Sequence, residues 1–221
     1  MFKIALDGPS GSGKSVMARA VAERLGFLYV DTGALYRAIG LYMFRNGIDI
    51  NDTETVSSNL SNIKLELSHS DDGQVVLLNG ENVNKDIRLP EISMYASKVS
   101  AIPTVREFLL NIQRETAEKN NVIMDGRDIG TVIFPDAQVK IFLFAKDEVR
   151  AMRRYKELVA KGIETTYEEV LSDMQKRDEN DRTRAIAPAV PAEDAIMLDS
   201  SDLNIEETIS TIIGIIDKKL K

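Results

Sequence analysis

The sequence predicts an α/β fold in which a mostly parallel sheet is covered by helices on both faces. Short apolar segments alternate with amphipathic helices over most of the 221 residues, a rhythm that favours parallel strands joined by helical crossovers. A glycine-rich loop follows the first apolar segment and opens the first helix. Between residues 63 and 101 alternating polar and apolar residues interrupt the rhythm, which indicates a small antiparallel insertion.

The glycine-rich loop fits the phosphate-binding pattern G-x-x-x-x-G-K-[ST], between a strand and a helix as the motif requires. Its residues are Gly8, Pro9, Ser10, Gly11, Ser12, Gly13, Lys14 and Ser15, with Val16 next in the helix. Backbone N–H groups and the helix N-terminus capture phosphate in such a loop. We expect a nucleoside triphosphate here, with Lys14 on its β- and γ-phosphates and the Ser15 hydroxyl on Mg²⁺. The alternative is a flexible glycine-rich turn.

The elements before the insertion follow from apolar runs that end at turn residues. Gly26 suits the end of the first helix, because glycine readily takes the left-handed conformation of a helix C-cap. The expected elements are a strand at 2–7, a helix at 16–25, a strand at 27–30, a turn at 31–33 and a helix at 34–45.

The inserted segment is predicted to begin as a hairpin. Ile63, Leu65 and Leu67 alternate with polar residues, as in a half-buried strand. The expected elements are this strand, a turn at Asp72–Gly73, a strand at 75–78, a turn at Asn79–Gly80, and helices at 90–99 and from 104 to about 119. Prolines precede or open both helices, as their fixed φ allows. His69 is expected on the surface.

The alternation of strands and helices resumes after the insertion. Strands are expected at 122–125, 139–144 and 195–199, and a last helix at 205–220. Two basic helices separated by Gly162 lie between the last two strands. The second begins with Thr166-Tyr167-Glu168-Glu169, which is a capping-box pattern.

Composition excludes several classes of protein. The formal net charge is -7, whereas a protein that binds a nucleic acid backbone usually has an excess of positive charge. No apolar run is long enough to span a membrane, and a strand from residue 2 leaves no room for a signal peptide. The chain has Cys 0, which excludes disulfides and agrees with a reducing compartment. We expect a cytoplasmic protein that binds small molecules.

Arginines gather where the strands end, which favours a second anion site beside the triphosphate. Arg37, Arg106 and Arg127 follow strand ends or open helices. Further arginines lie in the basic helices: Arg150, Arg153, Arg154, Arg177, Arg182 and Arg184. Arg177, Asp181 and Arg184 are spaced to share one helix face, where they could hold a phosphate and a ribose. A solvated face with ordinary ion pairs is the alternative.

The run Asp125-Gly126-Arg127-Asp128 follows a buried strand, so its carboxylates should lie near the triphosphate. One carboxylate could support Mg²⁺ through water, although the run could also be an ordinary β-turn.

The guanine-reading pattern Asn-Lys-x-Asp of GTPases is missing, since Asn84-Lys85-Asp86 lacks the spacer. A small acidic chain with clustered arginines favours a kinase that acts on a small phosphorylated acceptor.

The later motifs narrow the kinase class. The chain resembles the bacterial cytidylate kinases in the segments GPSGSGKS, DTGALYR, PTVRE, DGRDIGTVIFPDA, KIFLFA, RDENDRTRAIAP and LDSSDL, which cover nearly its whole length. The resemblance implies one phosphate-loop kinase domain over residues 1–221. It also implies a nucleoside-monophosphate-binding insertion at 63–101 and a short helical lid at 150–165.

The resemblance assigns roles to residues. Arg37, Arg127 and Arg184 would grip the acceptor phosphate, and Ser97, Arg106 and Asp128 would bind the cytosine. Arg177 and Asp181 would contact the ribose, and Thr32 would lie near the acceptor nucleotide. Base recognition by Asp128 then competes with the Mg²⁺ role and is preferred. Lys14, Arg127, Arg184 and a lid arginine would be catalytic; Arg153 is taken for the lid, with Arg150 and Arg154 left open.

The implied reaction is transfer of the γ-phosphoryl group of ATP to CMP or dCMP with Mg²⁺, in a protein expected to be a monomer. No nucleic acid or membrane partner is expected. The lid and the insertion should close over the substrates and exclude water. Two alternatives stay open: a kinase of the same fold for UMP, AMP or a small metabolite, and a non-catalytic nucleotide-dependent switch.

Overall fold

The computed structural model describes residues 1–70 and 73–220. The chain divides into two compact units. One comprises Tyr29–Asn120 together with Met1, and the other comprises Phe2–Leu28 with the chain from Asn121 onward. The first contains the residues expected as an insertion, and the second contains the phosphate loop.

The sheet confirms the predicted α/β class. Its strand order is β2-β6-β1-β7-β8, for β1 (Lys3–Asp7), β2 (Leu28–Asp31), β6 (Val122–Gly126), β7 (Val139–Phe144) and β8 (Ile196–Asp199). β1 pairs in parallel with β6 and β7, and β7 with β8. β1, β6 and β7 are buried along nearly their whole length, as expected for strands covered on both faces.

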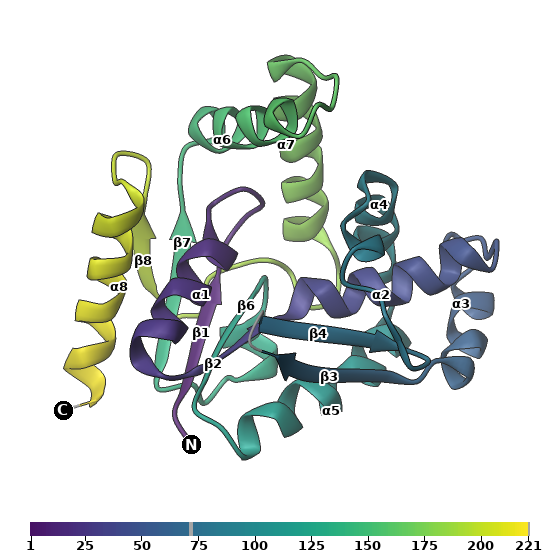
Figure 1. Cartoon of the computed structure of the whole chain (residues 1–221), viewed down its shortest axis with the longest axis horizontal. Coiled ribbons are helices and arrows are strands. Elements are labelled where there is room, and N and C mark those ends of the chain that lie inside the picture. Colours follow the sequence, from purple (N-terminus) through teal and green to yellow (C-terminus); the bar gives the residue numbers. More distant parts are fainter. Residues whose placement is uncertain (71–72, 221) are drawn as a thin grey trace. The chain divides into compact units, whose positions relative to one another are not determined.

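Helices α1 (Lys14–Leu25) and α8 (Ile205–Leu220) lie against each other beside this sheet (Figure 1). α8 buries Thr208, Ile209, Ile212 and Ile216, which recur at helical spacing on one face. α1 begins two residues earlier than the sequence predicts, because Gly13 in the left-handed conformation is its N-cap. Lys14 and Ser15 therefore lie in the first turn of the helix.

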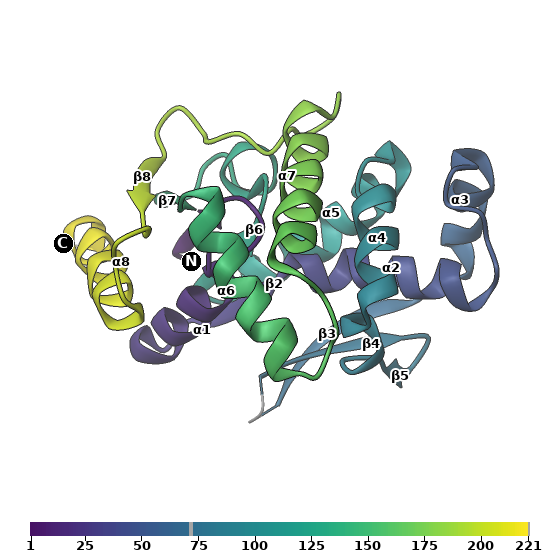
Figure 2. The ribbon, with the colours of Figure 1, turned by 90° about the horizontal axis from the view of Figure 1, so that it is seen from above.

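α6 (Asp147–Ala160) and α7 (Tyr167–Thr183) lie side by side (Figure 2). They share a small core of Ala151, Val170 and Met174. The predicted capping box is confirmed: Glu169 N–H donates to Thr166 Oγ1 at 3.2 Å, and Thr166 N–H donates to Glu169 Oε2 at 2.8 Å. This reciprocal pair satisfies two backbone donors and fixes where α7 begins.

The unit at 29–120 has its own core. Its elements are α2 (Thr32–Arg45), α3 (Thr53–Asn59), β3 (Leu65–Ser70), β4 (Gly73–Leu78), β5 (Glu81–Asn82), α4 (Pro90–Val99) and α5 (Pro103–Glu118), with short 3₁₀ turns at Leu60–Asn62 and Asp86–Arg88. β3, β4 and β5 form an antiparallel sheet. Gly40 lets α2 approach α4 closely, since a Cβ there would lie 2.9 Å from Tyr95 Cβ.

Several expected boundaries need correction. α2 begins at Thr32 and not at Ala34, because the Asp31 carboxylate caps it by accepting the Ala34 N–H at 3.0 Å. α3 is absent from the prediction, although Asp52 caps it in the same way. The turn at Asn79–Gly80 is confirmed by positive φ angles of 50° and 85°. Of the turn expected at Asp72–Gly73, Asp72 lies outside the described residues.

α7 ends at Thr183, so the expectation that Arg184 shares a helix face with Arg177 and Asp181 is wrong. Arg184 has an extended backbone, with φ -61° and ψ 141°. Arg177 and Asp181 do lie one turn apart on α7. In the part of the chain that the structure describes, no helix is long and apolar enough to cross a bilayer.

Candidate active site

The phosphate loop runs from the end of β1 to the start of α1, and its glycines are required by its geometry. Gly8, Gly11 and Gly13 have φ angles of 150°, 69° and 91°, which side chains with a Cβ rarely adopt. A Cβ on Gly8 would lie 2.0 Å from the Leu143 carbonyl oxygen. The loop therefore passes against the end of β7 at a distance that only glycine permits.

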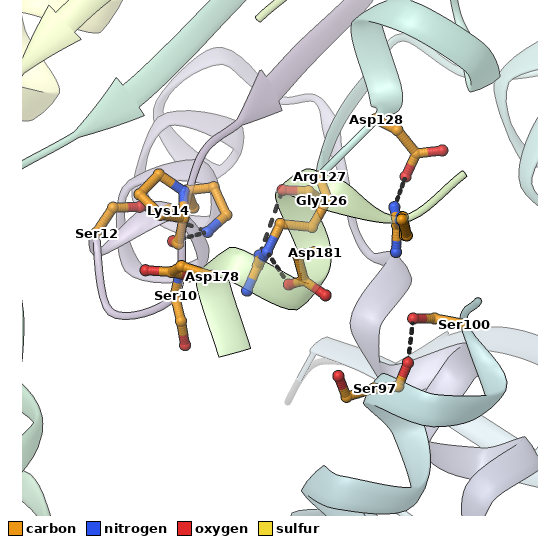
Figure 3. A network of polar contacts seen from close by, with 12 residues as sticks. Ser10, Ser12, Lys14, Ser97, Ser100, Gly126, Arg127, Asp128, Asp178 and Asp181 are labelled. Atoms are coloured by element: carbon orange, nitrogen blue, oxygen red, sulfur yellow. Dashed lines mark hydrogen bonds and ion pairs between the residues drawn. The ribbon is translucent and has the colours of Figure 1, made fainter. Parts of the chain in front are cut away.

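Lys14 is buried at the centre of this loop (Figure 3). Its Nζ donates to the Pro9 carbonyl at 2.7 Å and to Ser12 Oγ at 3.4 Å. Burial, and to a smaller extent the Arg127 guanidinium, lower the pKa of Lys14 to about 7, against the raising effect of the carboxylates of Asp125, Asp7 and Asp178. Two cations thus lie close together, an arrangement that an anion between them would stabilise.

Ser15 Oγ donates to Asp125 Oδ2 at 2.7 Å. Asp125 is buried near the end of β6, the strand that pairs with β1 in the sheet. The pair offers a hydroxyl and a carboxylate, and such oxygen ligands suit Mg²⁺, which usually takes only one or two protein ligands besides waters and phosphates. The residues present therefore fit this ion.

Arg127 and Arg184 each contact a buried carboxylate, and Figure 3 shows Arg127 beside Asp181. Arg127 Nε donates to Asp181 Oδ2 at 3.1 Å, and Arg184 Nη2 lies 3.5 Å from Asp128 Oδ1. Asp181 comes from α7, so this helix brings its side chain to the Asp-Gly-Arg-Asp run. The structure groups Arg127, Asp128, Asp181 and Arg184 as two neighbouring ion pairs.

Asp7 holds the segment that follows Asp128. Its Oδ1 and Oδ2 accept the backbone N–H groups of Ile129 and Gly130, each at 2.8 Å. These residues open a short π-helical turn, Ile129–Ile133, for which Asp128 is the N-cap. Burial raises the pKa of Asp7 to about 6, against the lowering effect of the two N–H donors.

The unit at 29–120 carries the remaining predicted acceptor residues. Arg37 Nη2 donates to Asp31 Oδ2 at 2.8 Å, so one carboxylate both caps α2 and holds this arginine; Thr32 lies in the first turn of α2. Arg106 is buried, donates to the Ser100 carbonyl at 3.1 Å and lies over the Tyr36 ring. Ser97 lies on α4, and its carbonyl accepts the Ser100 hydroxyl at 2.7 Å.

The three arginines of α6 differ in their surroundings. Arg150 Nη1 donates to the Ser10 carbonyl at 2.6 Å, so this side chain touches the phosphate loop. Arg153 Nη2 donates to the Ser200 carbonyl at 2.7 Å, and the half-exposed Arg154 pairs with Glu157 at 2.8 Å. Arg150 therefore contacts the phosphate loop, while Arg153 and Arg154 contact other segments.

Comparison with known proteins identifies the family. A sequence model described as cytidylate kinase matches residues 4–218. The chain belongs to the cytidylate kinase family. The curated cytidylate kinase of Carboxydothermus hydrogenoformans is 47% identical over 218 residues, which are 99% of this chain and 98% of that protein. That of Caldanaerobacter subterraneus subsp. tengcongensis is 49% identical over 219 residues, which are 99% of this chain and 96% of that protein.

Solved structures resemble this member of the cytidylate kinase family in fold. A sugar kinase from Janibacter sp. HTCC2649 has a TM-score of 0.50 at 16% identity, covering 98% of this chain and 95% of that chain. An uncharacterized protein from Eubacterium ventriosum has a TM-score of 0.50 at 16% identity, covering 98% and 99%. These likenesses agree with the α/β fold predicted from the sequence.

Sequence reasoning missed Asp7 and Asp178 of this cytidylate kinase family member, and it placed Asp125 near the triphosphate without its bond to Ser15. Asp7, Asp125 as the partner of Ser15, and Asp178 beside the phosphate loop all contact the loop or its neighbours. Asp7 carried a signal, because a charged residue follows three apolar strand residues and directly precedes Gly8. Asp178 carried a weaker one, since it belongs to the RDENDRTR segment, where helical spacing would pair it with Arg182 rather than with the loop.

Proposed function

We propose that this chain transfers the γ-phosphoryl group of ATP to the 5′-phosphate of CMP or dCMP, giving CDP or dCDP and ADP. The observation that carries the proposal is the closeness of Lys14 and Arg127 in a chain of the cytidylate kinase family. One cation comes from the phosphate loop and the other from the segment after β6. Two phosphate groups that approach each other need such paired cations.

The proposed reaction is an in-line displacement. The bond between the γ-phosphorus and its bridging oxygen breaks while a bond forms to an oxygen of the acceptor phosphate. That oxygen is already anionic, so no strong general base is needed. Lys14 stabilises the charge that develops on the β- and γ-phosphates, and the catalytic arginines Arg127 and Arg184 stabilise the acceptor side. Mg²⁺, which Ser15 would ligate with Asp125 close by, neutralises triphosphate charge when bound.

The proposed lid contact to the transferring phosphate comes from α6. Arg153 was the residue taken from the sequence, and its Nη2 donates to the Ser200 carbonyl at 2.7 Å. The direct contact between Arg150 and the Ser10 carbonyl favours Arg150 for this role. Arg153 remains a prediction that a variant can test.

The proposed CMP contacts are assigned unit by unit. Within residues 29–120 they are Thr32, Arg37, Ser97 and Arg106, and in the other unit they are Arg127, Asp128, Arg177, Asp181 and Arg184. Cytosine offers an amino donor and two acceptors, which a carboxylate, a hydroxyl and a guanidinium complement. The ATP contacts are residues 8–16.

The proposal also covers the metabolic role, the location, the oligomeric state and the domain boundaries of the enzyme. The enzyme would act in pyrimidine nucleotide metabolism in the cytoplasm, and it would work as a monomer. The domain boundaries taken from the sequence, an acceptor-binding insertion at 63–101 and a lid at 150–165 within one kinase domain, remain part of the proposal.

The test is whether CMP becomes CDP. We expect mass spectrometry to detect stoichiometric CDP and ADP from CMP and ATP with Mg²⁺, and a rate at least about a hundredfold lower for Lys14→Ala.

Asp128→Ala should raise the KM for CMP far more than the KM for ATP, because it removes a base contact. Equal rises in the KM for CMP and in the KM for ATP would assign Asp128 to the metal. Failure of the unsubstituted chain to form CDP would overturn the proposed function.

A further inference from the structure

Asp178 lies in the middle of α7, and the proposed reaction gives it no part. Its Oδ1 accepts the Ser10 N–H at 2.9 Å, and its Oδ2 accepts Arg150 Nη1 at 2.5 Å (Figure 3 shows Asp178 beside Ser10). An aspartate in a helix interior ordinarily pairs with side chains three or four residues away. This one instead reaches the backbone of the phosphate loop, 168 positions distant in sequence.

Arg150 closes the arrangement from α6. Its Nη1 also donates to the Ser10 carbonyl at 2.6 Å, and its Nε donates to the Ala145 carbonyl at 3.0 Å. Its Nη2 donates to Asp147 at 2.5 Å, and only 4% of the side chain is exposed. Both backbone groups of Ser10 are thus bound by one partly buried ion pair, so the loop is bonded to α6 and α7 at this residue.

The same helices pack against the next residue of the loop. A Cβ on Gly11 would lie 2.6 Å from Met174 Cε and 3.5 Å from Arg150 Cβ. Met174 precedes Asp178 by one helical turn, so an apolar contact and a charged contact come from one face of α7. The phosphate loop therefore contacts both helices, at Ser10 and at Gly11.

A carboxylate near a triphosphate would repel it, so its presence needs a physical reason. Here the Asp178 charge is offset by the Arg150 guanidinium and by a backbone N–H. Hydrogen bonds to charged groups are the stronger kind, and a loop held in its binding geometry loses less freedom when a ligand binds. The Asp178 carboxylate therefore adds a local negative charge but holds the phosphate loop in its binding geometry.

We propose that Asp178 is a positioning residue for phosphoryl transfer, which fixes the phosphate loop at Ser10 and orients Arg150 toward that loop. The inference rests on the proposed function and deepens it, since it assigns a role to a residue outside the proposed nucleotide contacts. Asp178 acts through Ser10 on triphosphate affinity and through Arg150 on the transfer step. These two effects are separable by substitution.

Two variants separate them. Asp178→Ala removes both contacts, so the dissociation constant of ADP by calorimetry and the KM for ATP should each rise about tenfold, with kcat reduced. Asp178→Asn keeps an oxygen for the Ser10 N–H but turns an amide NH₂ toward Arg150. It should bind ADP nearly as the unsubstituted chain does while kcat falls about tenfold. The KM for CMP should change little in either variant.

Asp173→Ala is the matched control, because Asp173 is an exposed aspartate on the same helix. It should behave as the unsubstituted chain. Unchanged ADP affinity and kcat in Asp178→Ala would overturn the inference. So would equal rises in the KM for ATP and CMP alongside a lower melting temperature, because that pattern is the one a purely structural residue gives.

Two further comparisons distinguish a failure of this inference from a folding defect and from a failure of the proposed function. If Asp178→Ala does not fold, the kcat of Asp178→Asn with unaltered ADP affinity decides, and an unchanged kcat overturns the role. If the unsubstituted chain phosphorylates no acceptor, the proposed function fails. The ADP dissociation constants of Asp178→Ala and Asp173→Ala still determine whether Asp178 positions the loop.

Discussion

Buried charges of both signs surround the start of α1, and each is held by a specific partner. Lys14 donates to the loop's own carbonyl, Asp125 accepts the Ser15 hydroxyl, and Asp7 accepts two backbone N–H groups. Buried charges are costly unless they are paired. Lys14 is therefore held by the loop itself, whereas Ser15 is held by a carboxylate that the sequence motif does not include.

The lowered pKa of Lys14 predicts that nucleotide binding takes up a proton. With a pKa of about 7, the lysine of the free protein is largely neutral at about pH 8, whereas phosphates beside it favour the charged form. Calorimetry of ADP binding at this pH, in buffers of different ionisation enthalpy, should show uptake approaching one proton. The uptake should shrink toward about pH 6, where Lys14 is already charged.

Lys14→Ala is the comparison for this measurement. Its ADP binding, though weaker, should show no uptake at about pH 8. Equal uptake in the variant would place the titrating group elsewhere, and no uptake in the unsubstituted chain would contradict the lowered pKa.

The raised pKa of Asp7 predicts a pH dependence of stability with a definite sign. Between its unfolded value of 3.8 and about 6, the folded state binds more protons than the unfolded state, so this group lowers stability as pH rises. The loss amounts to about 3 kcal/mol in total and is complete above about pH 6. Asp7→Asn cannot ionise and should lack this contribution.

The check is urea unfolding of both proteins across this pH range. The difference in unfolding free energy between Asp7→Asn and the unsubstituted chain should shift in favour of the variant as pH rises from about 4 to about 6. A difference that stays constant with pH would show that Asp7 is ionised as readily in the folded chain as in the unfolded one.

Among the elements, those with strong local signals were predictable from the sequence. Strand 139–144, helix 90–99 and the capping box of α7 match the prediction, because apolar periodicity, a first-turn proline and Thr166 with Glu169 fix their ends. Arg184 was misplaced, since helical spacing continues past Thr183 while the backbone does not. The Asp178 contact was not predictable, because it joins segments far apart in sequence.

Gly40 provides a test of how tightly α2 packs on α4. A Cβ there would lie 2.9 Å from Tyr95 Cβ and 3.0 Å from the Ala96 nitrogen. Gly40→Ala should therefore destabilise the chain by about 1–3 kcal/mol, as overpacking does. Gly214→Ala in α8 is the control, because no atom other than the local backbone of its own helix lies within 4 Å of its Cβ position.

The control should stabilise the chain by up to about 1 kcal/mol, since alanine favours helix over glycine. Denaturant unfolding of the two variants measures both effects. If Gly40→Ala stabilises as Gly214→Ala does, the close approach of the two helices is wrong.

At the scale of the whole molecule, the sequence predicted the fold class and the family, and residue roles remain proposals. The parallel sheet is confirmed by the parallel pairing of β1, β6, β7 and β8, and the antiparallel insertion by the antiparallel pairing of β3, β4 and β5. The compact unit at 29–120 extends beyond the segment 63–101, because α2 and α5 also bury apolar side chains in its core. Strand alternation marks the hairpin but not the helices packed around it.

The proposed closure predicts slower amide exchange when both substrates are bound. ATP with CMP should protect amides in residues 63–101 and 150–165, because closed segments exclude water from the reaction. Each nucleotide alone should protect fewer amides. Exchange that is unaltered in both segments with both nucleotides bound would contradict closure.

The central claim is that this chain phosphorylates a pyrimidine monophosphate that it identifies by its base. The most direct measurement is ADP production from ATP and Mg²⁺ with CMP, dCMP, UMP, AMP and GMP, each at the same concentration. We predict strong stimulation by CMP and dCMP and little by the other three. Stimulation by AMP or GMP to the same extent as by CMP, or by none of the five, would contradict the account.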